Sequence, residues 1–88
     1  MAQKAPSAVI TENFGSTTLY RCTFTDIDDA DTYTSNVTSA VMWWCNPTDE
    51  PTNEFENIDV GYAQSTGTFT FYPAEASRTG DLYILARS

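Results

Sequence analysis

The feature of this sequence that most limits its possible folds is an alternation of apolar and polar residues with a period of two. Residues 67–72 and 81–85 show it most clearly. Because successive side chains of a β-strand point to opposite faces, this alternation predicts strands with one buried face. It recurs in at least five segments without a competing helical period. The sequence therefore predicts an all-β domain.

The expected inward-facing side chains follow from the same alternation. In residues 19–25 they are Tyr20, Cys22 and Phe24, in 58–62 they are Ile58, Val60 and Tyr62, and near the end they are Phe69, Phe71, Leu82, Ile84 and Ala86. Residues 31–35 are polar around one tyrosine and suit an edge strand. Residues 64–67 predict the turn of a hairpin. Six to seven short strands favour a small antiparallel β-sandwich or flattened β-barrel.

One central strand is expected in residues 39–45. Val41, Trp43 and Cys45 fall on one face and Met42 and Trp44 on the other, so both faces are apolar and both are expected to be covered. Because adjacent side chains point in opposite directions, one tryptophan should lie in the core. The other should pack under a loop or at a subunit interface, with a sugar-binding platform as the alternative.

The length of 88 residues allows one domain with a single thin core. Residues 1–7, which include Lys4 and Pro6, are interpreted as an N-terminal arm, and residues 8–88 as a single β domain. The longest apolar run is much shorter than the roughly 20 residues that a membrane-spanning helix needs. We therefore expect a soluble protein that does not bind a membrane.

The net charge of −8 excludes a surface that follows nucleic-acid phosphates, because twelve carboxylates face only four cationic side chains. With no histidine, no nucleophile motif and little room for a cleft, we expect no enzyme activity and no cofactor. Cys22 and Cys45 lack the spacing of a metal or redox site and are expected to be buried thiols, with a disulfide as the open alternative.

Residues 26–31 carry four aspartates in six positions and are predicted to form a solvated turn with Asx-type hydrogen bonds. A calcium site is the alternative. A helix-loop-helix calcium loop that began at Asp26 would need Gly at position 31 and Glu at position 37, where this chain has Asp31 and Val37. A calcium site of another kind stays open.

Several segments of the chain resemble small β-rich proteins of tailed-bacteriophage virions. These are residues 24–26 and 28–33, Ile58-Asp59-Val60, the hairpin strand at 67–71 and the closing run at 77–85, in total 26 of the 88 residues. Ala30 stands where members of this group often have glycine. Similar proteins are taken to be capsid decoration or cement proteins, which sit on the outside of the head and clamp neighbouring major capsid subunits.

The resemblance implies a virion protein of the outer capsid surface, made in the host cytoplasm. Its expected partners are the major capsid protein and neighbouring copies of itself, as a dimer or trimer. Tail, neck or fibre components and a small carbohydrate-binding module remain as alternatives. The expected contacts lie in the arm, in the loops at 46–54 and 73–80 and on exposed cationic or aromatic side chains. The candidate residues are Lys4, Pro6, Arg21, Trp44, Pro47, Pro51, Phe55, Arg78 and Arg87.

Overall fold

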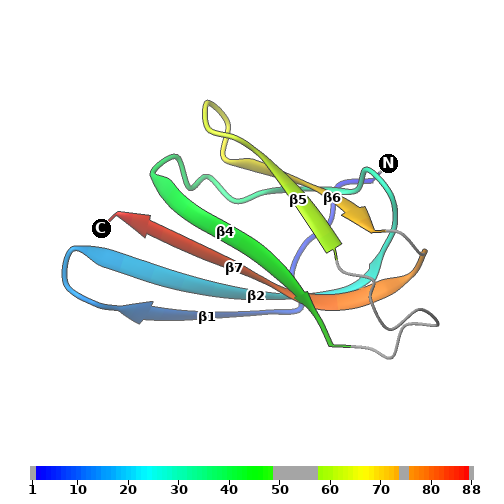
Figure 1. The fold of residues 1–88 in the computed structure, drawn as a ribbon, viewed down its shortest axis with the longest axis horizontal. Coiled ribbons are helices and arrows are strands. Elements are labelled where there is room, and N and C mark those ends of the chain that lie inside the picture. The colour runs from blue at the N-terminus through cyan, green and yellow to red at the C-terminus, as the bar shows by residue number, and fades with distance from the viewer. Residues whose placement is uncertain (1, 49–57, 74–75, 88) are drawn as a thin grey trace.

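The protein folds into one curled antiparallel sheet in a computed structural model that describes residues 2–48, 58–73 and 76–87. Within these ranges the chain forms seven strands and no helix. The strands are β1 (Ala8–Asn13), β2 (Thr17–Ile27), β3 (Thr32–Thr34), β4 (Ala40–Pro47), β5 (Ile58–Ala63), β6 (Thr68–Pro73) and β7 (Arg78–Arg87). Their order in the sheet is β1-β2-β7-β4-β5-β6-β3 (Figure 1). The predicted all-β class and strand number are confirmed.

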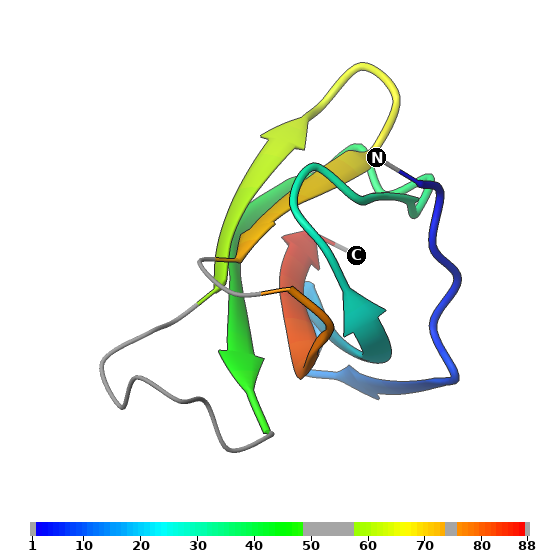
Figure 2. The same ribbon diagram turned by 90° about the vertical axis from the view of Figure 1, so that its right-hand side faces the viewer.

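The sheet curls into a half-barrel, and the segment before β1 runs along its open side (Figure 2). Gln3 forms a parallel bridge with Thr32 in β3. The Lys4 N–H donates to the Thr32 carbonyl at 2.6 Å, and the Thr32 N–H donates to the Ala2 carbonyl at 2.8 Å. Residues 2–4 of the predicted arm are therefore docked on β3 of their own chain.

The core lies on the concave side of the sheet and consists mainly of large apolar side chains. Phe24, Phe69, Phe71 and Leu82 are fully buried, and Ile84 is almost so. The Phe24 and Phe71 rings lie 5.1 Å apart with their planes tilted by 60°. Such ring pairs contribute about 0.5 to 1.5 kcal/mol beyond the area that they bury. The alternation in β2, β6 and β7 therefore predicted the buried faces correctly.

A bulge in β4 corrects the expected position of Val41. Ala40 pairs with Ala86 and Met42 with Leu85, so two residues of β4 span one step of β7. Val41 is the extra residue, and it is 48% exposed. Trp43 packs against the core, whereas Trp44 is exposed on the other side. One face of this strand is therefore covered by the core, and within the described residues no loop covers the other, so its covering by a partner stays a prediction.

The acidic segment at 26–31 forms a turn with aspartate hydrogen bonds to backbone N–H groups, as predicted, but part of it is buried rather than solvated. β2 continues past the expected end to Ile27, which is fully buried, after a register shift between Phe24 and Ile27. Asp31 is only 2% exposed. Its two carboxylate oxygens accept hydrogen bonds from the backbone N–H groups of Ala2 and Asp28. This segment is therefore a hydrogen-bonded turn that holds the arm in place.

The turn between β5 and β6 lies where the sequence predicted it, whereas the connection between β6 and β7 is shorter than predicted. β5 and β6 form the predicted hairpin, in which the Gly67 N–H donates to the Ala63 carbonyl at 2.9 Å. The expected loop at 73–80 is wrong at its end, because β7 begins at Arg78. Most of the expected loop at 46–54 lies outside the described residues, while Asn46 and Pro47 close β4.

Candidate functional site

The convex side of strands β1, β2, β7 and β4 carries a continuous surface that we call the outer face. Its side chains form two rows across the strands. One row is Ile10, Arg21, Tyr83 and Trp44, and the other is Glu12, Leu19, Leu85 and Met42. Within each row the residues are direct cross-strand partners, because the strands pair in register. The alternation of each strand places these side chains opposite the buried core residues.

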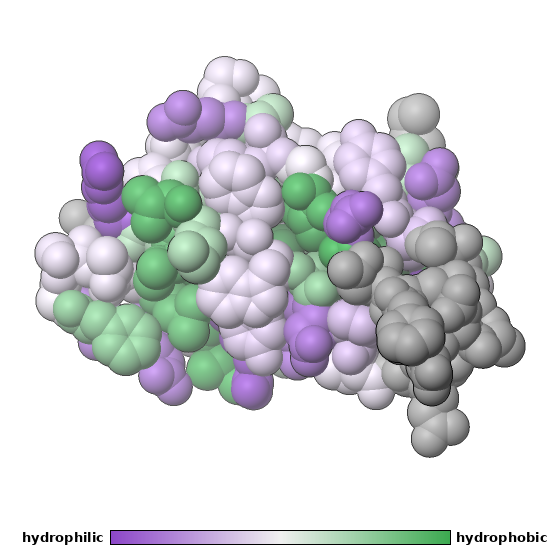
Figure 3. Space-filling model, in the orientation of Figure 1, coloured by the Kyte–Doolittle hydropathy of each residue, from purple (hydrophilic) through white to green (hydrophobic). Residues whose placement is uncertain are grey.

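The outer face exposes large apolar side chains. Ile10 is 45% exposed, Met42 55% and Trp44 42%. Together with Val41 beside Met42 they present roughly 400 Å², because a half-exposed large side chain contributes on the order of 100 Å². Figure 3 shows apolar residues gathered over these strands. Contiguous apolar patches of this size on small proteins often mark binding sites.

Two aromatic rings lie side by side on this surface. The Trp44 and Tyr83 rings are stacked, with centroids 5.0 Å apart and an angle of 8° between their planes. They come from the paired strands β4 and β7. Tryptophan and tyrosine are enriched among the residues that dominate binding energy at protein interfaces. The stacked pair is therefore the strongest candidate anchor on the outer face.

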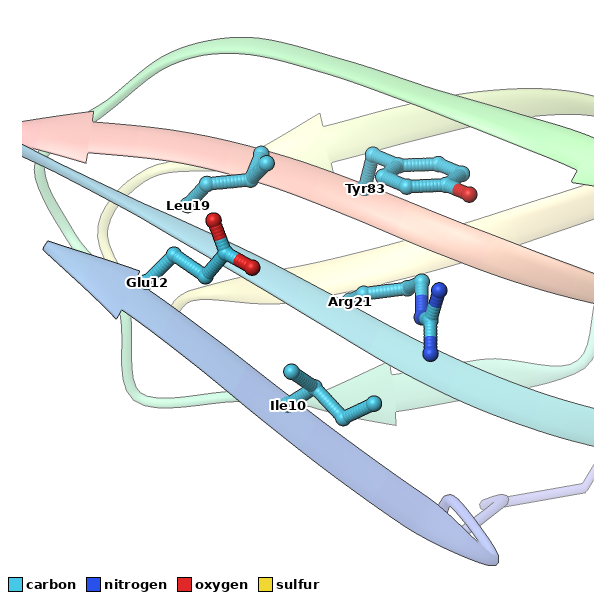
Figure 4. A pocket seen from close by; sticks show the side chains of 5 residues that line it. All are labelled: Ile10, Glu12, Leu19, Arg21 and Tyr83. Carbon is cyan, nitrogen blue, oxygen red and sulfur yellow. The ribbon is translucent and has the colours of Figure 1, made fainter.

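A shallow hollow lies beside this aromatic pair. Its lining residues are Ile10, Glu12, Leu19, Arg21 and Tyr83, and its volume is about 220 Å³ (Figure 4). Pockets that enclose cofactors or drug-sized ligands are usually about 300 to 1,000 Å³. The hollow is smaller than these and is open to one side, so it fits a protruding side chain of a partner better than an enclosed small molecule.

The charges of the outer face differ from those of the chain as a whole. Arg21 and Arg87 are exposed, and both belong to strands of this surface. Glu12 in β1 and Asp81 in β7 lie at outward positions, and Asp81 accepts a 2.8 Å hydrogen bond from the Thr23 hydroxyl. The charges of these four residues balance, while the whole chain carries −8. The exposed Asp26, at the register shift near the end of β2, belongs to neither row.

The candidate contact residues predicted from the sequence fall into three groups. Arg21, Trp44 and Arg87 are exposed on the outer-face strands, and Lys4, Pro6 and Pro47 are half-buried. Arg78 is only 2% exposed, so it is not an accessible partner contact, and this prediction is corrected. Pro51 and Phe55 lie outside the described residues. Sequence reasoning missed Ile10, Met42 and Tyr83. Their places on the outward-facing side of the apolar–polar alternation could have indicated them.

The two cysteines are buried thiols on opposite sides of one residue. Both Cys22 and Cys45 pair with Leu82, so a whole strand separates them. Burial raises the pKa of the Cys45 thiol to about 12 and also raises that of Cys22. Protonated, buried thiols are poor nucleophiles. Neither cysteine is therefore available on the outer face.

Among the described residues there is no group of three or more acidic, cysteine or histidine side chains that could hold a metal ion. These ranges also contain no apolar helix of membrane-spanning length. Comparison of the chain with protein families, with curated proteins and with solved structures found no match. Among the described residues, the outer face is therefore the candidate functional site.

Proposed function

We propose that this chain is a capsid decoration protein of a tailed bacteriophage, which binds the outer surface of the head and stabilises contacts between major capsid subunits. The observation that carries the proposal is the exposed apolar outer face, centred on the stacked rings of Trp44 and Tyr83. The resemblance of 26 of the 88 residues to virion proteins supplies the kind of partner.

The properties of the fold support this role. A protein that clamps a shell needs a broad, rigid contact surface rather than a deep pocket, and the outer face is held on four paired strands. Its central charges are balanced, so docking does not bury a large net charge. The acidity of the rest of the chain favours solubility before assembly.

The proposal is tested first by mass spectrometry of purified virions of the phage that encodes the chain. We expect the protein in the mature particle, at a copy number that follows capsid symmetry. Absence from the virion would end the proposal. A copy number and position that follow the tail, neck or fibre would instead support those alternatives.

The second test measures binding of the purified protein to heads that lack it, by co-sedimentation. Met42→Glu places a charge in the apolar outer face and should weaken binding at least tenfold. Tyr72→Glu is the matched control, because Tyr72 is 49% exposed but lies on β6, outside the outer face. Equal binding by the two variants would show that the outer face is not the contact surface.

A carbohydrate-binding module is the second candidate, and the exposed Trp44–Tyr83 pair is the observation that favours it. Aromatic faces on a protein surface can stack against sugar rings. A glycan array probed with the purified protein separates the two functions. Binding to a defined sugar that Trp44→Ala abolishes would favour the module over the capsid protein.

A further inference from the structure

The two edge strands of the sheet differ in whether other residues of the chain cover them. β3 is the last strand on one side, and residues 2–4 cover its outer edge with backbone hydrogen bonds. β1 is the last strand on the other side, and β2 is its only strand neighbour among the described residues. All six residues of β1 are exposed. One edge is therefore protected and the other is bare.

The hydrogen-bond pattern shows which backbone groups of β1 are free to bind another strand. The Phe14 N–H donates to the Thr17 carbonyl at 2.8 Å, at the end of the ladder between β1 and β2. Because antiparallel hydrogen bonds alternate, Ala8, Ile10 and Glu12 also bond toward β2. The N–H and C=O groups of Val9 and Thr11 therefore point away from the sheet.

β1 lacks the features that usually prevent edge-to-edge pairing. Its sequence, Ala-Val-Ile-Thr-Glu-Asn, contains no proline and no lysine, and its pairing with β2 is regular over all six residues. Val9 is 48% exposed and Ile10 45%, so both faces of the strand offer apolar area beside the edge. Glu12 is its one charged residue.

From these observations we propose that β1 pairs antiparallel with β1 of a second copy of the chain, around a two-fold axis at Thr11. The two sheets then join into one, and the outer faces of both copies become continuous. The proposal concerns a surface other than the outer face, and it does not depend on the capsid function.

A second copy fits this edge better than an unrelated strand because the pairing is self-complementary. A two-fold axis at Thr11 places Thr11 beside its own equivalent and Val9 beside Asn13 of the other copy. On the convex side, each Glu12 then lies beside Ile10 of the other copy. Because Ile10 pairs with Arg21 in each copy, Glu12 of one copy then lies in the same row as Arg21 of the other copy. Glu12 also stays diagonally adjacent to Arg21 of its own chain. Two copies with a charge of −8 each thus meet where their local charges balance.

The first test measures molar mass by size-exclusion chromatography with light scattering over a range of concentrations. The wild-type protein should reach twice the 9.8 kDa of the chain. Thr11→Pro removes an N–H that faces away from β2, a position where an edge strand tolerates proline. This variant should raise the dimer dissociation constant at least tenfold. Thr11→Val keeps the N–H and the branched shape, so this matched control should remain dimeric.

The second test uses disulfide crosslinking and keeps the proposal testable if Thr11→Pro does not fold. Thr11→Cys places two thiols opposite each other at the proposed axis, and the native cysteines, 1% and 7% exposed, do not compete. Under mild oxidation it should form a covalent dimer at least ten times faster than Ser65→Cys, a control in the exposed turn between β5 and β6.

These measurements can overturn the proposal in three ways. A wild-type protein that stays at 9.8 kDa at all concentrations would exclude the dimer. A dimer that survives Thr11→Pro in a folded protein would place the interface elsewhere. Equal crosslinking rates at positions 11 and 65 would do the same. All three measurements use the purified protein alone. They can therefore exclude the β1 dimer without testing whether the protein binds capsids.

Discussion

Replacing Asp31 with asparagine should destabilise the protein by loosening the contact between the arm and β3. The Asp31 Oδ1 accepts from the Ala2 N–H at 2.9 Å and the Oδ2 accepts from the Asp28 N–H at 2.8 Å. Asparagine retains one oxygen, so its NH₂ group must face one of these two N–H donors. A buried donor left without an acceptor costs about 1 to 3 kcal/mol. We therefore expect Asp31→Asn to lower the free energy of unfolding by about 2 kcal/mol.

The loss should depend on pH in a defined direction. Burial raises the pKa of Asp31, but the hydrogen bonds from Asp28 and Ala2 and the charge of Lys4 together outweigh it and hold the pKa below the ordinary value of 3.8. A carboxyl group with a lowered folded-state pKa contributes stability above its unfolded pKa. That stability is lost as the pH falls through the folded-state pKa. The difference between wild type and Asp31→Asn should thus be largest near neutral pH and shrink in acid.

Urea denaturation at pH 7 and at pH 3, followed by tryptophan fluorescence, measures both effects. For a domain of this size, 2 kcal/mol also corresponds to roughly 10 °C in melting temperature. Asp29→Asn is the matched control, because Asp29 is exposed in the same turn and should change stability by less than about 0.5 kcal/mol. If the two variants were equally stable at pH 7, or if the deficit of Asp31→Asn were unchanged at pH 3, the reasoning would be refuted.

Three further predictions concern the backbone and the buried thiols. Gly67→Ala should lower stability by about 2 kcal/mol or more, because Gly67 has a φ of +69° and an added Cβ would lie 2.8 Å from the Val37 nitrogen; thermal melts that match wild type would contradict this. Ala30→Gly should raise stability by about 0.5 kcal/mol, because Ala30 has a φ of +65°, and a lower melting temperature would refute the strain. Cys22 and Cys45 should resist iodoacetamide at pH 8 in the native protein and react after denaturation. Rapid labelling of the native protein, measured by mass spectrometry, would show that burial does not protect them.

The sequence predicted the strand faces well because the alternation of side chains is a local property. Phe69, Phe71 and Leu82 are buried as expected, and Arg21 is on the exposed face as expected. Parity does not determine the order of strands. Arg21 and Trp44 lie in one row only because β7 is placed between β2 and β4. The local pattern of residues does not predict this strand order.

The sequence-based predictions were wrong where the position or burial of a residue depends on a segment that is distant in the chain. The bulge at Val41 depends on how β4 matches β7, and a local pattern cannot detect it. Asp31 is buried because Ala2, which is 29 residues away, donates to it. Ala30 adopts a left-handed backbone with a φ of +65°, a conformation that glycine adopts without strain.

The central place of β7 also determines when the sheet can form during synthesis. β7 lies between β2 and β4 but is the last strand in chain order, so the two halves of the sheet lack their shared neighbour until residues 78–87 have left the ribosome. Until then, the edges of β2 and β4 that later pair with β7 are unpaired and available to strands of other nascent chains. Chaperone protection at this stage should therefore raise the yield of this protein.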